Sequence, residues 1–86
     1  MSIDDEVALD LGCERCARVY MAILRRRGTS WLNQIVRDTG MTRKSVKRHL
    51  KRLLFLRLVS HEAGCLYRIV KEIDSVKGWE GGEKHE

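Results

Sequence analysis

The sequence predicts one small, mainly α-helical domain that carries a β-hairpin near its C-terminal end. The chain has 86 residues, which is enough for a single modest hydrophobic core and leaves no room for a second domain. Apolar residues recur at three- and four-residue spacing between residues 12 and 55, as in amphipathic helices. Further along, two short apolar runs at 58–61 and 65–70 flank a three-residue connection that contains Gly64, the pattern of a hairpin.

The first predicted helices precede residue 40. Residues 1–10 should form an N-terminal arm or a helical extension, because Ser2 and Asp5 have the spacing of a weak capping box. The better supported helix covers about 12–27, and Gly28 ends it. Another covers about 31–39, with Thr29 and Ser30 before it as a short connection or a one- or two-bridge strand.

An amphipathic helix over 42–55 is the element around which the rest of the domain is arranged. Gly40 provides the tight turn before it, and Thr42 is a candidate N-cap. At about 100° per residue, Val46, Leu50 and Leu53 fall on one face. Four cations fall on the other side, namely Lys44, Lys47, Arg48 and Lys51. A helix held by an apolar side with a basic side outward suits the major groove of DNA.

Charge is distributed very unevenly along the chain. Residues 25–57 carry eleven cations and one acid, a net charge of +10, whereas 1–24 carry −3 and 58–86 carry −2. A concentrated positive charge favours a polyanionic partner, since each neutralised phosphate releases condensed counterions. A basic face kept only for solubility is the alternative. The placement of four cations on one helix face favours nucleic acid.

Several segments together carry a resemblance to a known family. TGMTRKSV spans the predicted turn, RHLKRL follows it, and LGCERCARVYMAIL precedes both. These segments resemble the winged helix-turn-helix domains of bacterial and archaeal transcription regulators of the ArsR and MarR groups. The resemblance implies a domain over 11–70 with a three-helix core and a two-stranded wing. Beyond it the apolar pattern fades, and we expect a partly disordered tail over 71–86.

The resemblance also implies which residues contact DNA. The third helix would enter the major groove and the wing would lie on the backbone. The expected DNA-facing residues are Thr42, Arg43, Lys44, Ser45, Lys47, Arg48, Lys51 and Arg68. Among them, Arg43, Lys44 and Lys47 are expected to reach base edges, whereas Arg48 and Lys51 favour phosphates. Arg57 departs from the family, which commonly has a glycine there, and the wing is shorter than usual.

The cysteines leave three interpretations open. Cys13 and Cys16 have the spacing of a metal or redox pair, and His49, His61 and Cys65 are the other residues that suit a zinc site. Two cysteines three residues apart on a helix suit core packing equally well, and the second short-spaced pair of a structural zinc site is missing. We therefore expect packed cysteines and no metal or cofactor, with metal sensing and a redox switch as the alternatives.

The predicted function is a sequence-specific double-stranded DNA-binding transcription regulator, cytoplasmic, without a membrane span and not an enzyme, because no catalytic constellation is present. A homodimer is expected from spare apolar residues: Val7, Leu9, Leu11, Phe55, Ile73, Val76 and Trp79. One rival is a winged-helix module that docks to a replication or transcription assembly. Another is a non-specific chromatin-type or RNA binder. Operator, target genes, effector and the sign of regulation are not predictable.

Overall fold

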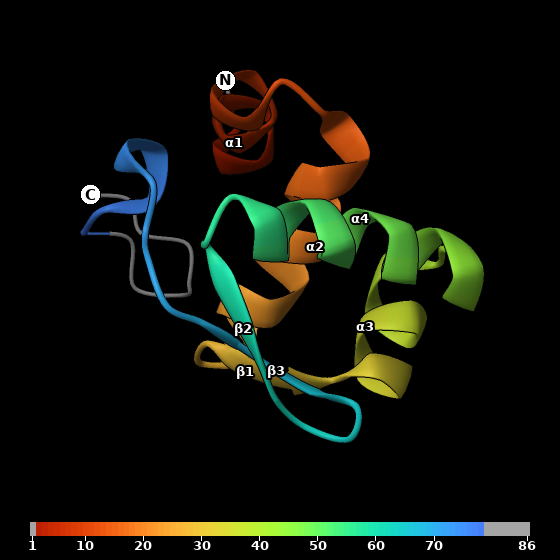
Figure 1. Cartoon of the computed structure of the whole chain (residues 1–86). Helices are drawn as coiled ribbons and strands as arrows, with labels where there is room; N and C mark the ends of the chain where they lie inside the picture. Colours follow the sequence, from red (N-terminus) through yellow and green to blue (C-terminus); the bar gives the residue numbers. More distant parts are fainter. Residues whose placement is uncertain (1, 79–86) are drawn as a thin grey trace.

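The protein is mainly helical, with one small antiparallel sheet. The computed structural model describes residues 2–78, and Figure 1 shows their arrangement. Within this range the helices are α1 (Ile3–Leu11), α2 (Glu14–Arg25), α3 (Leu32–Thr39) and α4 (Arg43–Phe55). The strands are β1 (Thr29–Trp31), β2 (Val59–Ala63) and β3 (Leu66–Ile69), and a 3₁₀ turn, η1 (Asp74–Val76), follows them. No helix of the described range has the length and apolar character needed to cross a membrane.

Helix α2 is the centre of the core, and α1, α3 and α4 all contact it. Its residues Tyr20, Met21 and Ile23 are fully buried. Helix α4 contributes the predicted stripe, since Val46, Leu50 and Leu53 are at most 1% exposed. The predicted apolar face of this helix is confirmed.

Glycines and polar caps end and begin the helices, as several of the sequence signals indicate. Gly12 separates α1 from α2 and Gly40 separates α3 from α4, and both have a left-handed backbone, with φ of 69° and 72°. The Thr42 hydroxyl accepts a hydrogen bond from the Ser45 amide at 3.1 Å, which confirms Thr42 as the N-cap of α4. Arg57 follows α4 with φ of 63°, so an arginine adopts the left-handed conformation that glycine commonly provides.

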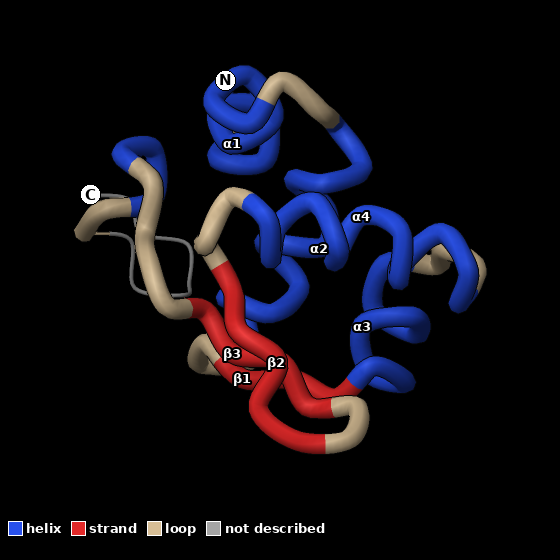
Figure 2. Tube along the Cα trace, viewed as in Figure 1, coloured by secondary structure: helices blue, strands red, loops and turns tan. Residues whose placement is uncertain are grey.

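The hairpin is part of a three-stranded sheet. The short strand that the sequence allows at Thr29 and Ser30 is present as β1 and joins the predicted two-stranded wing. The strand order is β1-β3-β2, and both pairings are antiparallel. Ser30 in β1 and His61 in β2 lie opposite Tyr67 of β3 from its two sides. The third strand arises because the connection after α2 is extended and reaches β3. Figure 2 shows the sheet at one end of the helical layer.

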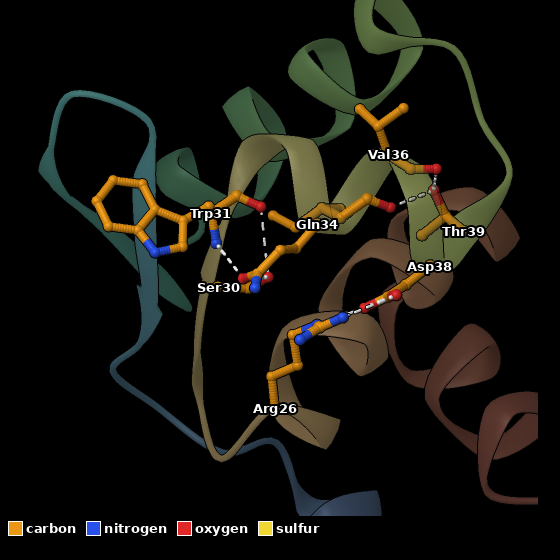
Figure 3. A network of polar contacts seen from close by, with 8 residues as sticks. Arg26, Ser30, Trp31, Gln34, Val36, Asp38 and Thr39 are labelled. Atoms are coloured by element: carbon orange, nitrogen blue, oxygen red, sulfur yellow. Dashed lines mark hydrogen bonds and ion pairs between the residues drawn. The ribbon is translucent and has the colours of Figure 1, made fainter.

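A network of polar contacts fixes both ends of α3 (Figure 3). At its start, the N-cap is Trp31, whose amide donates to the Gln34 side-chain oxygen at 3.0 Å. At its end, the Thr39 hydroxyl donates to the Ile35 carbonyl at 2.7 Å. An ion pair between Arg26 and Asp38, 2.6 Å long, joins the end of α2 to the end of α3.

The two ends of the described chain pack against each other, which corrects two expectations. The helix that the Ser2–Asp5 spacing predicts is present, since the Ser2 hydroxyl accepts a hydrogen bond from the Asp5 amide at 3.3 Å at the start of α1. Gly12 separates this helix from α2, so the described core has four helices where three are expected. Helix α1 contacts η1, and Val76 is fully buried. The Tyr20 hydroxyl also donates to the Lys71 carbonyl at 2.8 Å. Residues 71–78 therefore belong to the folded domain, whereas Trp79 and the rest of the predicted disordered tail lie outside the described residues.

This packing also removes part of the apolar surface expected for a dimer. Val7, Leu11 and Val76 are buried in the core of their own chain, at 0%, 8% and 0% exposure. These side chains are buried because α1 packs against both α2 and η1. Leu9 and Phe55 remain exposed, at 70% and 83%.

Candidate nucleic-acid interface and thiol–imidazole cluster

The predicted DNA-facing residues of α4 gather on its solvent side. Lys44, Lys47, Arg48 and Lys51, called the basic face below, are all exposed. They lie opposite the buried stripe of the same helix, because residues three and four apart share one side of a helix. Within the described residues, none of the four forms an ion pair. The basic face therefore presents four uncompensated positive charges to solvent.

The beginning of α4 is open as well as basic. Thr42 and Arg43 are exposed, Ser45 is half-buried, and the first turn of the helix carries no acidic residue. The free amides at a helix N-terminus attract anions, and here the cations lie on the same turn. The Arg43 guanidinium donates a hydrogen bond to the Asn33 side-chain oxygen of α3. Arg43 is thus held across the turn between α3 and α4, a contact that residue spacing does not indicate.

Arg68 lies apart from the α4 residues. It is exposed on β3, and its guanidinium forms an ion pair with Glu62 of β2 at 3.2 Å. The carboxylate competes with a phosphate for this guanidinium, so Arg68 is a weaker candidate contact than the basic face. Glu62 also accepts a hydrogen bond from the Ser60 hydroxyl. This hydrogen bond, and then the positive charge of Arg68, lower the pKa of the Glu62 carboxyl.

Asp38, the one acid in residues 25–57, is paired with a cation. Asp38 forms a bidentate contact with Arg26, at 2.6 and 3.1 Å. The hydrogen bond from Arg26 is the largest cause that lowers the pKa of the Asp38 carboxyl. Asp38 therefore stays ionised and engaged at the end of α3, and it does not oppose the charge of α4.

Two thiols and one imidazole lie close together where α4 crosses the beginning of α2. The Cys16 Sγ and His49 Nδ1 atoms are 3.4 Å apart, and the Cys13 Sγ and His49 Nδ1 atoms are 3.9 Å apart. All three ligand-type atoms lie within 4.8 Å of one another. These residues are called the thiol–imidazole cluster below. Their spacing in the sequence favours separate packing over a shared zinc site, whereas the structure brings the three side chains into contact.

Local structure explains how each member is positioned. Cys13 is the N-cap of α2, and its sulfur accepts a hydrogen bond from the Cys16 amide at 3.2 Å. Cys16 is fully buried, whereas Cys13 and His49 are half-buried. His49 lies at the edge of the buried stripe of α4, between that stripe and the basic face, so it faces α2. The cluster is therefore reached from solvent on the side of Cys13 and His49.

The cluster has unusual proton affinities, each with a physical cause. Burial raises the pKa of the Cys16 thiol to about 12, and its hydrogen bond to Cys13 adds to the rise. Burial also acts to raise the pKa of Cys13, but hydrogen bonds from Cys16 and the charge of Arg52 outweigh it and the net shift is downward. Burial and then the positive charge of Arg48 lower the pKa of His49, which favours the neutral imidazole.

The other two candidate zinc ligands lie elsewhere. Cys65 is exposed at the turn between β2 and β3. The His61 ring donates a hydrogen bond from Nε2 to the Gly64 carbonyl and stacks on Tyr67, with the ring centroids 4.6 Å apart. Within the described residues, the convergent set is limited to the three members of the thiol–imidazole cluster.

Arg52 is a residue near the cluster that no sequence motif singles out. Its charge lowers the proton affinity of both cluster cysteines and of His49. It lies three residues after His49 on the same side of α4, so the helical period alone places it beside the cluster once His49 is known to face α2.

Known proteins offer no relative that would assign a role to these features. No family model matches the chain, and no curated protein or solved structure does either. Two features of this chain therefore bear on its function. One is the basic face of α4, and the other is the thiol–imidazole cluster on the flank of the same helix.

Proposed function

We propose that the protein is a sequence-specific double-stranded DNA-binding transcription regulator of the winged helix-turn-helix type. In this proposal α3 and α4 form the helix-turn-helix, α4 enters the major groove, and the β2–β3 hairpin is the wing. The observation that carries the proposal is the basic face of α4, exposed and without ion pairs in the described structure, opposite a fully buried stripe.

The shape of α4 supports a groove-binding role over general solubility. An α-helix with its side chains is about 10–12 Å in diameter and so fits a major groove about 12 Å wide, and the 13 residues of α4 give it a length of about 20 Å. Its apolar side is anchored on α2 and α3, so the basic face is held on a rigid support. A surface that serves solubility usually intersperses both signs of charge, whereas α4 carries cations and no acid.

The rest of the surface adds less to DNA binding. The wing carries Arg68, which is ion-paired with Glu62, and the turn between its strands carries Gly64 and Cys65 without a cation. We therefore assign most of the affinity to α4 and only a minor part to the wing. Arg57 is a further exposed cation, between α4 and β2.

The test is fluorescence anisotropy with a duplex obtained by selection and with a random duplex, repeated over a range of salt concentrations. Wild type should prefer the selected duplex and show a steep salt dependence. The double variant Lys44→Ala, Lys47→Ala should lose selectivity, by about 1–3 kcal/mol for each base that is no longer recognised. The double variant Arg48→Ala, Lys51→Ala should weaken both duplexes alike and lower the salt slope by about 0.9 for each phosphate that is no longer neutralised.

A matched control removes two positive charges away from α4. Lys71→Ala combined with Lys77→Ala makes the same change in net charge, in the segment around η1. It should leave selectivity and salt slope unchanged. Equal losses in all three double variants would instead indicate sequence-blind charge binding, the behaviour of a chromatin-type coat, and would refute the assignment of α4 as a reader.

A protein-interaction module is the second candidate function, and the exposure of Phe55 favours it. Phe55 ends α4 and is 83% exposed, which is unusual for a large aromatic side chain. Leu9 of α1 is 70% exposed. If wild type binds no duplex at low salt, then a Phe55→Ser variant that no longer binds a protein partner would support this second candidate.

Dimerisation belongs to the proposal as well and has its own test. Leu9 and Phe55 remain as apolar residues for a contact between two copies. Size-exclusion chromatography with light scattering at tens of micromolar measures the mass directly. A species of twice the chain mass would support a palindromic binding site, whereas a 10.0 kDa species, the mass of one chain, would remove the dimer and the palindrome together.

A further inference from the structure

The thiol–imidazole cluster has the composition of a metal site. Two sulfurs and one imidazole nitrogen converge, although His49 follows Cys16 by 33 residues and Cys13 by 36 residues in the sequence. Soft thiolate and imidazole ligands select zinc-like ions and exclude Mg²⁺ and Ca²⁺, which prefer oxygen. We propose that Cys13, Cys16 and His49 bind one thiophilic metal ion of the Zn²⁺ class, which joins the beginning of α2 to α4.

The distances fit such an ion. Tetrahedral zinc has Zn–S bonds of about 2.3 Å and Zn–N bonds of about 2.0–2.1 Å, so the ligand atoms lie about 3.5–3.8 Å from one another. The two sulfur-to-nitrogen distances here are 3.4 and 3.9 Å, and the third separation is below 4.8 Å. Small side-chain rotations are enough to place all three atoms around one ion.

The surroundings also suit coordinated thiolates. The Cys16 amide already donates to the Cys13 sulfur, and such outer-shell hydrogen bonds orient metal ligands. Two thiolates and one Zn²⁺ have no net charge, so the complex is compatible with the burial of Cys16 and with the nearby charges of Arg48 and Arg52.

The site has an open coordination position. Among the residues that the structure describes, no fourth histidine, cysteine or carboxylate joins the cluster. Cys13 also lines a surface hollow between α1 and α2. Three protein ligands and one exchangeable water or small thiol are the arrangement of an accessible site, in contrast to the closed four-ligand shell of a structural zinc site.

The primary test is a titration of the full-length reduced protein with Co²⁺, which reports tetrahedral sulfur coordination by its absorption. Wild type should bind one equivalent and develop visible d–d bands and a thiolate charge-transfer band. His49→Gln and Cys13→Ser should each weaken binding by at least about 100-fold, the upper range for losing even an outer-shell partner. Zn²⁺ should displace Co²⁺ and bleach the spectrum.

The chain provides matched controls for each ligand type. Cys65→Ser removes a thiol and His61→Gln removes an imidazole outside the cluster, so both should keep the wild-type spectrum. Circular dichroism checks that each variant is folded. Because His49 is only half-buried, His49→Gln should fold even if Cys16→Ser, which changes a buried residue, does not. Absence of a cobalt spectrum in folded wild type, or equal loss in the control variants, would overturn the site.

A second measurement concerns regulation, and this part rests on the proposed function. Because His49 is on the flank of α4, an ion that ties it to α2 sets the position of the basic face. Zn²⁺ should change the affinity for the selected duplex by about 5–150-fold in wild type and not in His49→Gln. An unchanged affinity would overturn the regulation alone. No duplex binding in any state would refute the proposed function, while the cobalt titration still decides the site.

Discussion

The backbone of Arg57 carries a strain that can be measured directly. Arg57 follows α4 with φ of 63°, in the left-handed region. This conformation costs a residue with a Cβ atom about 1–2 kcal/mol, whereas glycine adopts it freely. Glycine loses about 0.5–1 kcal/mol more backbone entropy on folding. The difference predicts that Arg57→Gly raises the free energy of unfolding by about 0.5–1 kcal/mol.

The assay is thermal and urea unfolding followed by circular dichroism. For a domain of about 60–100 residues, 1 kcal/mol corresponds to about 4–8 °C in Tm, so the expected rise is about 2–8 °C. Arg57→Ala separates the backbone from the side chain, because alanine keeps the Cβ atom and the strain. It should have a Tm close to that of wild type.

Two further substitutions make the interpretation specific. Arg27, which also has φ of 63°, should respond to glycine in the same direction. Lys51→Gly in the interior of α4 should instead destabilise by about 1 kcal/mol, since a helical residue gains nothing from left-handed freedom. A Tm of Arg57→Gly below that of Arg57→Ala would refute the reasoning and would mean that the left-handed turn carries no strain.

Three other predictions test how the ends of the chain and of α3 are held. Tyr20→Phe should lose about 0.5–1.5 kcal/mol in urea unfolding, because the Lys71 carbonyl loses its donor; an unchanged midpoint would mean that this hydrogen bond contributes nothing. Val76→Ala should cost about 2 kcal/mol, because two buried methyl groups are removed, and a loss below about 0.5 kcal/mol, less than one buried methylene contributes, would show that η1 is not docked. Asp38→Asn should lower the urea midpoint at pH 7. Because Arg26 lowers the folded pKa of Asp38, that stabilisation is complete above the ordinary carboxyl pKa of 3.8 and disappears as pH falls through the folded value. Equal differences between Asp38→Asn and wild type at neutral pH and at a pH below the folded pKa would contradict this assignment.

The predictable parts of the structure are those whose information is local. The stripe of Val46, Leu50 and Leu53 follows from helical periodicity, and the left-handed Gly40 and the Thr42 cap follow from the chemistry of single residues. Each of these signals lies within one short stretch of chain, so it does not depend on how the chain folds back.

The parts that escape the sequence are long-range contacts. Pairing of Ser30 with Tyr67 makes the third strand, and docking of Val76 on α1 makes the C-terminal segment part of the core. The sequence indicates a short strand at Ser30 but not its partner, because each of these contacts joins residues far apart in the chain. The same holds for the salt bridge of Arg26 with Asp38, which joins two different helices.

The thiol–imidazole cluster combines both kinds of information. The spacing of Cys13 and Cys16 is visible in the sequence, but it fits a packed helix as well as a metal pair. Only the crossing of α2 by α4 brings His49 to the two sulfurs. Helical periodicity limits where such a ligand can be, since a residue that touches α2 has to lie between the buried stripe and the solvent side.

That position gives the cluster its mechanical relation to the basic face. Arg48 precedes His49 and Arg52 follows it by one turn, so a rotation or shift of α4 that tightens His49 on the cysteines moves the neighbouring cations by a similar amount. Because packed interfaces change between discrete arrangements, a displacement at the cluster would be passed along α4 as a rigid-body change in the proposed regulation. If the proposed DNA binding holds, a metal ion that prefers one arrangement needs no separate ligand-binding domain to influence it. The cluster and the basic face are then two sides of one helix, and each constrains the other through it.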